Sequence, residues 1–179
     1  MKILLLSYFY APEASPGAYR WTPVAECWIS QGHEVDVVCA WKPGLLRRET
    51  INGVRVHRVG GGIVESVRKR LRGRVGGAMQ GSHTAAPPDG ARATASLAKR
   101  LHDLTWKKVY WPDFACPWFF PALREKRRLL AEGGHDAMLS TSFPFTAHLI
   151  GRAAKRRFPE VSWTVDMGDP FSFVGGTPS

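Results

Sequence analysis

The first 34 residues constrain the fold of this chain more than any other stretch. Residues 2–8 form an apolar run, long enough for a strand buried on both faces and too short to span a bilayer. Residues 11–17 carry two prolines and a glycine, which exclude both strand and helix. Apolar side chains then recur at the spacing of one buried helix face, at Trp21, Val24, Ala25 and Trp28. Gly32 follows, where a left-handed residue ends such a helix. This order of strand, loop and helix is typical of the opening unit of an α/β domain.

The loop and the helix start carry the first functional expectation. A helix that begins at the carboxyl end of a parallel strand presents free N–H groups to an anion, so we expect a phosphate to bind there. Pro23 leaves two alternatives for this helix start. Either Thr22 caps the helix and Pro23 is its first residue, or residues 18–21 form a separate or kinked first turn.

The length and composition of the chain are those of one soluble globular domain. The chain has 179 residues, of which 44% are hydrophobic and 22% charged. Its three cysteines are widely spaced and odd in number, which favours neither a disulfide framework nor a metal site. We expect Cys27 and Cys39 to be buried thiols in a reducing cytoplasm. The N-terminus imitates a signal peptide, but its apolar run leads directly into the loop and helix and is interpreted as the first strand.

Positive charge is the strongest compositional signal. The formal net charge is +10, and its excess is clustered in residues 68–74, 124–128 and 152–157. Such a surface attracts phosphates on nucleic acid, lipid headgroups or small substrates. The alternative for each block is a solvated helix face.

The rest of the chain alternates between strands and helices. Strands are predicted at residues 35–39, at 54–59 after an Asn-Gly turn from a short arm, at 136–140 and at 161–165. Helices are predicted at residues 122–131 and from 142 to about 158, the second with Ala147, Ile150 and Ala154 inward. Residues 63–100 are interpreted as a mobile basic insertion, with an amphipathic helix near 64–71, and residues 101–109 as a helix. The aromatic segment 110–121 either covers a sheet face or lines a groove.

Five motifs in this order resemble the N-terminal domain of family 4 glycosyltransferases. They are residues 10–20, 31–35, 51–58, 140–148 and 165–171, and they leave out mainly the insertion. The resemblance implies a Rossmann-like, mostly parallel sheet flanked by helices, which is the acceptor-side half of a GT-B fold. It also implies a retaining transfer of sugar from a nucleotide-sugar donor to a glycan or lipid-linked acceptor. The donor-binding C-terminal domain of that architecture, and the last strand and helix of the first domain, are not recognised in these 179 residues. We therefore expect a fragment, a truncated gene product or a half that works with a separate donor domain.

The resemblance assigns donor and substrate contacts to the opening loop. Gly17 matches the glycine whose backbone approaches the donor diphosphate, and a residue without a Cβ suits close approach to an anion. Its neighbours, Pro16 and Ala18, stand where the family often has a second glycine. Arg20 is expected to bind the donor as well, and Pro16 the substrate. The alternative for Gly17 is a plain tight turn.

The later landmarks supply the remaining site residues. Asp166 and Asp169 follow the last predicted strand, where open α/β sheets place ligands, and there they orient sugar hydroxyls or pair with a cation such as Arg20. Asp166 is assigned to substrate binding, and Asp169 and His148 to catalysis. The alternatives are a helix cap or structural salt bridge for the carboxylates and a structural role for the histidine.

Two functions remain open at this level. One is the glycosyltransferase half, which needs no cofactor besides its nucleotide-sugar co-substrate and no metal site. It is cytoplasmic and docks through its basic blocks on the anionic inner face of the plasma membrane. The other is a non-catalytic basic module for anionic lipid or nucleic acid. The sequence carries no zinc spacing, RNP-type motif or clear helix-turn-helix, so nucleic acid is not expected as a partner.

Overall fold

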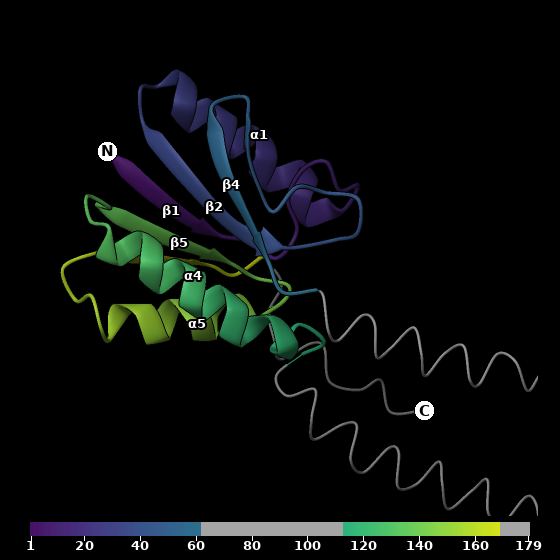
Figure 1. The fold of residues 1–179 in the computed structure, drawn as a ribbon. Helices are drawn as coiled ribbons and strands as arrows, with labels where there is room; N and C mark the ends of the chain where they lie inside the picture. The colour runs from purple at the N-terminus through teal and green to yellow at the C-terminus, as the bar shows by residue number, and fades with distance from the viewer. Residues whose placement is uncertain (62–112, 169–179) are drawn as a thin grey trace, which may run out of the picture.

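The computed structural model describes residues 1–61 and 113–168. A single sheet with strand order β3-β4-β2-β1-β5-β6 forms the middle layer of the fold (Figure 1). The strands are β1 (Lys2–Leu6), β2 (Glu34–Ala40), β3 (Arg48–Ile51), β4 (Val54–Val59), β5 (Ala137–Thr141) and β6 (Ser162–Asp166). The helices are α1 (Pro16–Ser30), the short 3₁₀ helix η1 (Cys116–Trp118), α4 (Phe119–Ala131) and α5 (Thr146–Lys155).

The sheet is parallel except at its edge, where β3 pairs antiparallel with β4. Helix α1 covers one face, while α4 and α5 cover the other (Figure 1). Strand β1 serves both layers, because Leu5 packs with the α1 side and Leu4 and Leu6 pack with the α4 and α5 side. A strand buried on both faces is apolar throughout and does not alternate with polar residues, and residues 2–8 show this continuous apolar pattern. The predicted α/β class with a mostly parallel sheet is confirmed.

Helix α1 starts earlier than expected: Pro16 and Gly17, assigned to the loop, lie in its first turn, and residues 18–21 belong to the same helix and not to a separate turn. It begins at Pro16, and its N-cap is Ser15, whose Oγ accepts a hydrogen bond from Ala18 N (3.3 Å). The helix runs through Pro23, whose side chain is exposed, so the ring projects into solvent. Thr22 does not cap the helix, because its Oγ1 accepts instead from the backbone N–H of Ala11 (3.3 Å). Gly32 adopts a φ of 81° and ends the helix as predicted.

The two helices on the other face begin at other residues than predicted, α4 earlier and α5 later. Helix α4 begins at Phe119, because part of the aromatic segment forms its first turn, and Trp118 just before it is buried in the core. Helix α5 begins only at Thr146, since Phe143 adopts a left-handed φ of 45° that breaks the helical path. The predicted inward residues of α5, which are Ala147, Ile150 and Ala154, are fully buried.

Burial overturns two smaller expectations. Cys27 is exposed, because it lies two residues beyond the inward-facing Ala25 and so on the outer side of α1, whereas Cys39 is buried as predicted. Lys126 of the second basic block is completely buried between α4 and α5 and is not part of a solvated face. The predicted insertion at residues 63–100, the helix at 101–109 and the basic block at 68–74 lie outside the described residues.

Candidate functional site

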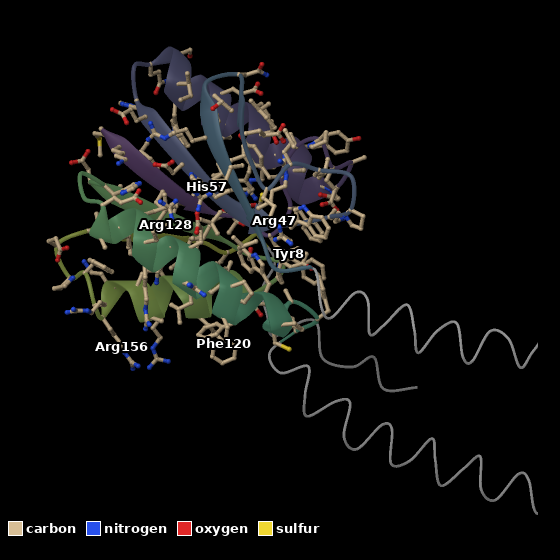
Figure 2. All side chains as sticks on the ribbon, in the orientation of Figure 1. Tyr8, Arg47, His57, Phe120, Arg128 and Arg156 are labelled. Carbon is tan, nitrogen blue, oxygen red and sulfur yellow. The ribbon has the colours of Figure 1, made fainter. Side chains whose placement is uncertain are left out.

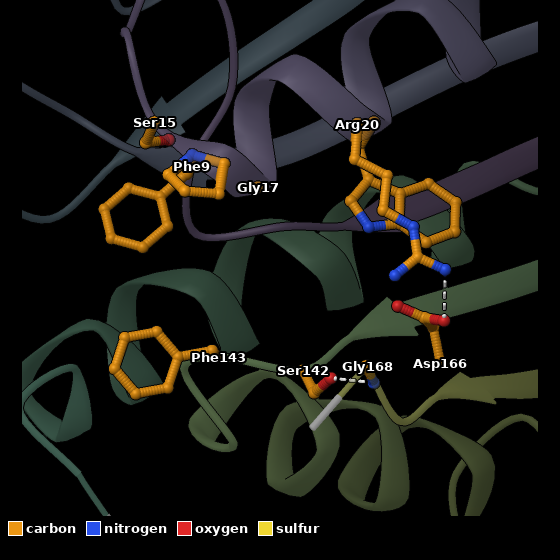
Figure 3. A pocket seen from close by; sticks show the side chains of 10 residues that line it. Phe9, Ser15, Gly17, Arg20, Ser142, Phe143, Asp166 and Gly168 are labelled. Atoms are coloured by element: carbon orange, nitrogen blue, oxygen red, sulfur yellow. Dashed lines mark hydrogen bonds and ion pairs between the residues drawn. The ribbon is translucent and has the colours of Figure 1, made fainter.

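A cavity of about 360 Å³ opens at the carboxyl edge of the sheet (Figure 3). Its lining comes from the segments that follow β1, β5 and β6: Phe9, Ser15, Pro16, Gly17, Arg20, Trp21, Ser142, Phe143, Asp166 and Gly168. The strand order reverses between β1 and β5, because the chain first adds β2 and β4 on one side of β1 and then β5 and β6 on the other. Ligands of open α/β sheets bind at such reversal points, so the cavity is the candidate functional site.

The start of α1 supplies an anion-binding group to this cavity. The first turn of a helix leaves N–H groups without intrahelical acceptors. Here Pro16 has no N–H, and that of Ala18 is bonded to Ser15 Oγ. The N–H of Gly17 has no hydrogen-bond partner within the described ranges, and the helix dipole places partial positive charge beside it.

The glycine at position 17 is not required by the local backbone. Gly17 lies within the helix and lacks the positive φ that favours glycine, and an added Cβ would meet Phe9 Cδ2 at 3.5 Å, an ordinary contact. The tight-turn alternative therefore does not describe this residue. What glycine does provide is an unobstructed N–H at the surface of the cavity.

An ion pair bridges the two walls of the cavity at one end. Arg20 Nη2 of α1 donates to Asp166 Oδ1 at the end of β6 at 3.0 Å, across 146 positions of sequence (Figure 3). The guanidinium of Arg20 lies 5.4 Å from the ring centroid of Trp21, which further orients it. The second oxygen of Asp166 has no hydrogen-bond partner among the described residues, so it is available to a ligand.

The loop between β5 and α5, together with the end of β6, forms the wall opposite α1. Ser142 Oγ accepts from Gly168 N at 2.6 Å, and Ser142 N donates to the carbonyl of Asp166 at 2.9 Å. These bonds hold the ends of β5 and β6 together beneath the cavity, with the Phe143 ring beside them (Figure 3).

His148 does not line the cavity. Its Nδ1 lies 2.8 Å from Ser140 Oγ, and Ser140 in turn accepts from Trp163 Nε1 at 3.0 Å. Ser140 Oγ donates to Nδ1 or accepts from it according to the tautomer of His148, and Nε2 is buried without a partner among the described residues. Burial lowers the pKa of His148 against the opposing charges of Asp166 and Asp113, so the ring is neutral near pH 7.

The opening loop is tied to the sheet by side chains from β4 and its neighbours. Arg58 is buried, and its Nη2 donates to the carbonyl of Ala11 at 2.6 Å. Lys42 forms an ion pair with Glu13. Sequence reasoning identified this loop but not the residues that hold it, although the alternation of β4 places Arg58 on the same face as the buried Val54 and Val56.

Four predicted site residues converge on the cavity: Pro16, Gly17, Arg20 and Asp166. Asp169 lies outside the described residues, and His148 is set apart from the cavity lining. Sequence reasoning did not single out Phe9, Ser142 or Phe143 as site residues. The sequence could have indicated these three residues only through their position, because each follows a strand that ends at the reversal point.

No metal cluster is present in the described part of the chain, where His, Cys, Asp and Glu side chains form no group of three or more able to hold an ion. The reversal-point cavity and the mostly parallel sheet covered on both faces together define an open α/β domain with a crevice at the carboxyl edge of its strands.

Comparison with known proteins shows which solved structure this fold resembles. The fold is similar to that of a sucrose-phosphate synthase from Thermosynechococcus elongatus, with a TM-score of 0.54 at 14% sequence identity. The similarity covers 92% of this chain and 32% of that one, so the chain spans about a third of the length of the solved protein. The similarity shows a fold like that of a GT-B glycosyltransferase. No family model matches the sequence, and no curated protein matches it.

Proposed function

We propose that this chain is the N-terminal, acceptor-side half of a family 4 glycosyltransferase. In this proposal the enzyme moves a sugar from a nucleotide-sugar donor to a glycan or lipid-linked acceptor, with retention of configuration. The observation that carries the proposal is the convergence of Gly17, Arg20 and Asp166 on one cavity at the reversal point of a GT-B-like domain. Nucleotide sugars carry a diphosphate next to a polyhydroxylated ring, and the cavity offers a group for each.

Each group has a defined role in the proposal. The Gly17 N–H and the Arg20 guanidinium bind the diphosphate, because both donate hydrogen bonds and carry positive charge or partial charge. Asp166 accepts hydrogen bonds from sugar hydroxyls, with Pro16 as an apolar contact. Asp169 and His148 stay predicted catalytic residues. A separate donor-binding domain completes the site, since transfer needs donor and acceptor held in one geometry.

The test is the binding of a nucleotide sugar to the 179-residue chain. Backbone amide chemical shifts are followed by NMR while UDP-glucose and GDP-mannose are titrated in turn. We expect the Gly17 and Arg20 amides to respond, and no sugar transfer by the isolated chain. Replacing Gly17 with Val should weaken binding tenfold to a hundredfold by obstructing a charge-assisted hydrogen bond.

Gly17→Ala is the matched control, because its single added Cβ makes an ordinary contact with Phe9 and leaves the N–H exposed. It should fold like the wild type and retain most of the affinity. If Val at position 17 leaves affinity unchanged in a folded protein, Gly17 does not contact the ligand. If no nucleotide sugar shifts these amides, the proposed function is wrong.

Docking on an anionic membrane belongs to the same proposal. Helices α4 and α5 and the turn that directly follows α5 expose arginines that have no acidic partner among the described residues: Arg124, Arg127, Arg152, Arg156 and Arg157. Phe120, which is 75% exposed, lies on the same two-helix layer (Figure 2). Cationic side chains beside an exposed aromatic ring suit a surface of anionic headgroups. None of the helices in the two described ranges has the length and apolar character needed to cross a bilayer.

A further inference from the structure

Two aromatic rings flank the cavity at the end away from the ion pair. Figure 3 shows Phe9 on the wall that follows β1 and Phe143 on the opposite wall. The ring of Phe114 contacts both, with centroids 6.3 Å from Phe9 and 5.6 Å from Phe143. Arg20 and Asp166 lie at the other end of the same cavity. The cavity therefore changes along its length from aromatic walls to charged groups.

Phe9 is held in place by its surroundings. Its ring lies edge-on to Tyr8, with centroids 4.9 Å apart, and tilted against Phe114 at 6.3 Å. The Lys42 ammonium lies 5.7 Å from its centroid. Phe9 also adjoins Gly17, whose Cα faces its ring closely enough that an added Cβ would touch it. A ligand group bonded to the Gly17 N–H would thus lie next to this ring.

Phe143 is placed in an unusual way for a large apolar residue. Its φ of 45° is in the left-handed region, which bulky residues rarely adopt, and its side chain is 52% exposed. Core burial therefore does not account for the conformation, although the ring is supported by Phe114 at 5.6 Å. Strained backbone of this kind concentrates at ligand-binding sites, where it aims a side chain.

The polar groups of this cavity fit one ligand chemistry. Within the described residues neither the Gly17 N–H nor the second oxygen of Asp166 has a hydrogen-bond partner, so the first can donate to an anion and the second can accept from hydroxyls. A pyranose ring has apolar C–H faces that pack on aromatic rings and hydroxyls around its edge that donate to carboxylates. A phosphate on that ring completes the match with Gly17 and Arg20.

We propose that this cavity binds a hexose phosphate unit, with the sugar ring between Phe9 and Phe143 and its phosphate at the Gly17 N–H. This inference rests on the proposed function and adds the two aromatic residues as determinants of specificity. The unit has two sources, which are the donor's own sugar phosphate and an acceptor that carries a phosphate.

The experiment measures dissociation constants of the 179-residue chain by amide NMR shifts for four probes: glucose 1-phosphate, glucose 6-phosphate, inorganic phosphate and AMP. We expect at least one hexose phosphate to bind about tenfold tighter than inorganic phosphate. Replacing Phe143 with Ala should remove that gain and leave the affinity for inorganic phosphate unchanged. Tighter binding of the 1-phosphate indicates the donor unit, and tighter binding of the 6-phosphate indicates a phosphorylated acceptor.

Phe120→Ala is the matched control, because Phe120 is also an exposed phenylalanine but lies on α4 outside the cavity lining. It should bind every probe as the wild type does. If Phe143→Ala leaves hexose phosphate affinity intact while the Gly17 amide still responds to phosphate, this inference is wrong and the proposed function stands. AMP as the tightest probe, lost in Phe143→Ala, would identify a nucleobase subsite instead and also overturn it. If no phosphate compound shifts the Gly17 amide, both proposals fail.

Discussion

Lys126 shows what burial does to a single charged residue. Its side chain is inaccessible to solvent between α4 and α5, and its Nζ donates one hydrogen bond, to the carbonyl of Ile150 at 3.0 Å. Burial, with a smaller contribution from the charge of Arg127, lowers the pKa of Lys126 to about 7. The amine is therefore largely neutral in the folded protein at mildly alkaline pH and fully protonated in the unfolded chain.

This difference predicts how stability depends on pH. Between about pH 7 and pH 9 the unfolded chain binds more protons at Lys126 than the folded protein does. The group therefore raises the free energy of unfolding by up to about 1.4 kcal/mol for each pH unit of increase. Replacing Lys126 with Met removes this contribution. The variant should be more stable than the wild type at pH 7, by an amount that shrinks toward pH 9.

Urea unfolding of both proteins at pH 7, 8 and 9 measures this change. Cys39, whose buried thiol has its pKa raised to about 12, is common to both proteins and cancels in the comparison. Arg124→Met, an exposed neighbour on α4, is the control and should follow the pH dependence of the wild type. Parallel curves for Lys126→Met and the wild type would show that the lysine is charged in the folded state.

Asp36 is the opposite case of a buried charge. Burial opposes its ionisation, but hydrogen bonds from Arg55, His135 and His57 at 2.8–3.0 Å outweigh that effect and hold the pKa of Asp36 well below its usual range. A buried carboxylate with several partners stays ionised, whereas a buried lysine with one neutral partner loses its proton. Sequence patterns alone do not separate these two outcomes.

At the scale of the element, helix α5 depends on a residue distant in sequence. Its own N-cap position, Phe145, provides no side-chain hydrogen bond. Asp113 supplies the cap instead, accepting from Thr146 N at 2.9 Å and from Thr146 Oγ1 at 2.7 Å across 33 positions. A carboxylate at a helix start satisfies a free N–H and interacts favourably with the helix dipole.

Replacing Asp113 with Ala should therefore destabilise the protein by about 1 kcal/mol. Asp113→Asn keeps an oxygen acceptor but loses the charge, so it should be destabilised by less than the Ala variant. Thermal unfolding followed by circular dichroism measures both. Equal melting temperatures for the wild type and the Ala variant would mean that solvent caps the helix equally well.

At the scale of the whole molecule, charge is distributed unevenly over the layers. The exposed arginines of α4, of α5 and of the turn after α5 lie on the layer opposite α1, and the second and third basic blocks of the sequence belong to these segments. The cavity opens at the edge of the sheet between the two layers. A surface on which α4 and α5 dock would thus leave the α1 layer away from the membrane.

Membrane docking predicts selective, salt-sensitive binding to vesicles. The protein should sediment with vesicles containing phosphatidylserine and not with pure phosphatidylcholine, and less so as salt rises. Replacing Arg152, Arg156 and Arg157 together with Gln should weaken binding by about 1 kcal/mol per charge. The matched control replaces Arg48, Arg55 and Arg128, which have acidic partners already. Equal binding to both vesicle types would rule out an electrostatic docking surface, and tighter binding to duplex DNA would favour the basic module.

The order and type of the elements were determined by the sequence itself. Apolar runs, helical spacing and glycine stops are local features, and they predicted every strand of the described ranges within about one or two residues except for the length of the short arm. The candidate anion site at the start of α1 was also predictable, because a break between a buried strand and an amphipathic helix is visible in the chain. Helix bounds were less accurate where an aromatic segment joined α4 and where Phe143 left the helical path of α5.

Only the tertiary structure decided which residues meet. The pairing of Arg20 with Asp166 was one of the alternatives that the sequence offered, but it was the fold that brought Phe9 and Phe143 to one cavity and Asp113 to the start of α5. Strand order is a non-local property that periodicity does not encode, so no local pattern distinguishes these pairs from others. Burial is also decided by the tertiary structure. In the sequence Lys126 belongs to a basic block that is expected to be solvated, but α5 packs over it, and its Nζ donates to the carbonyl of Ile150.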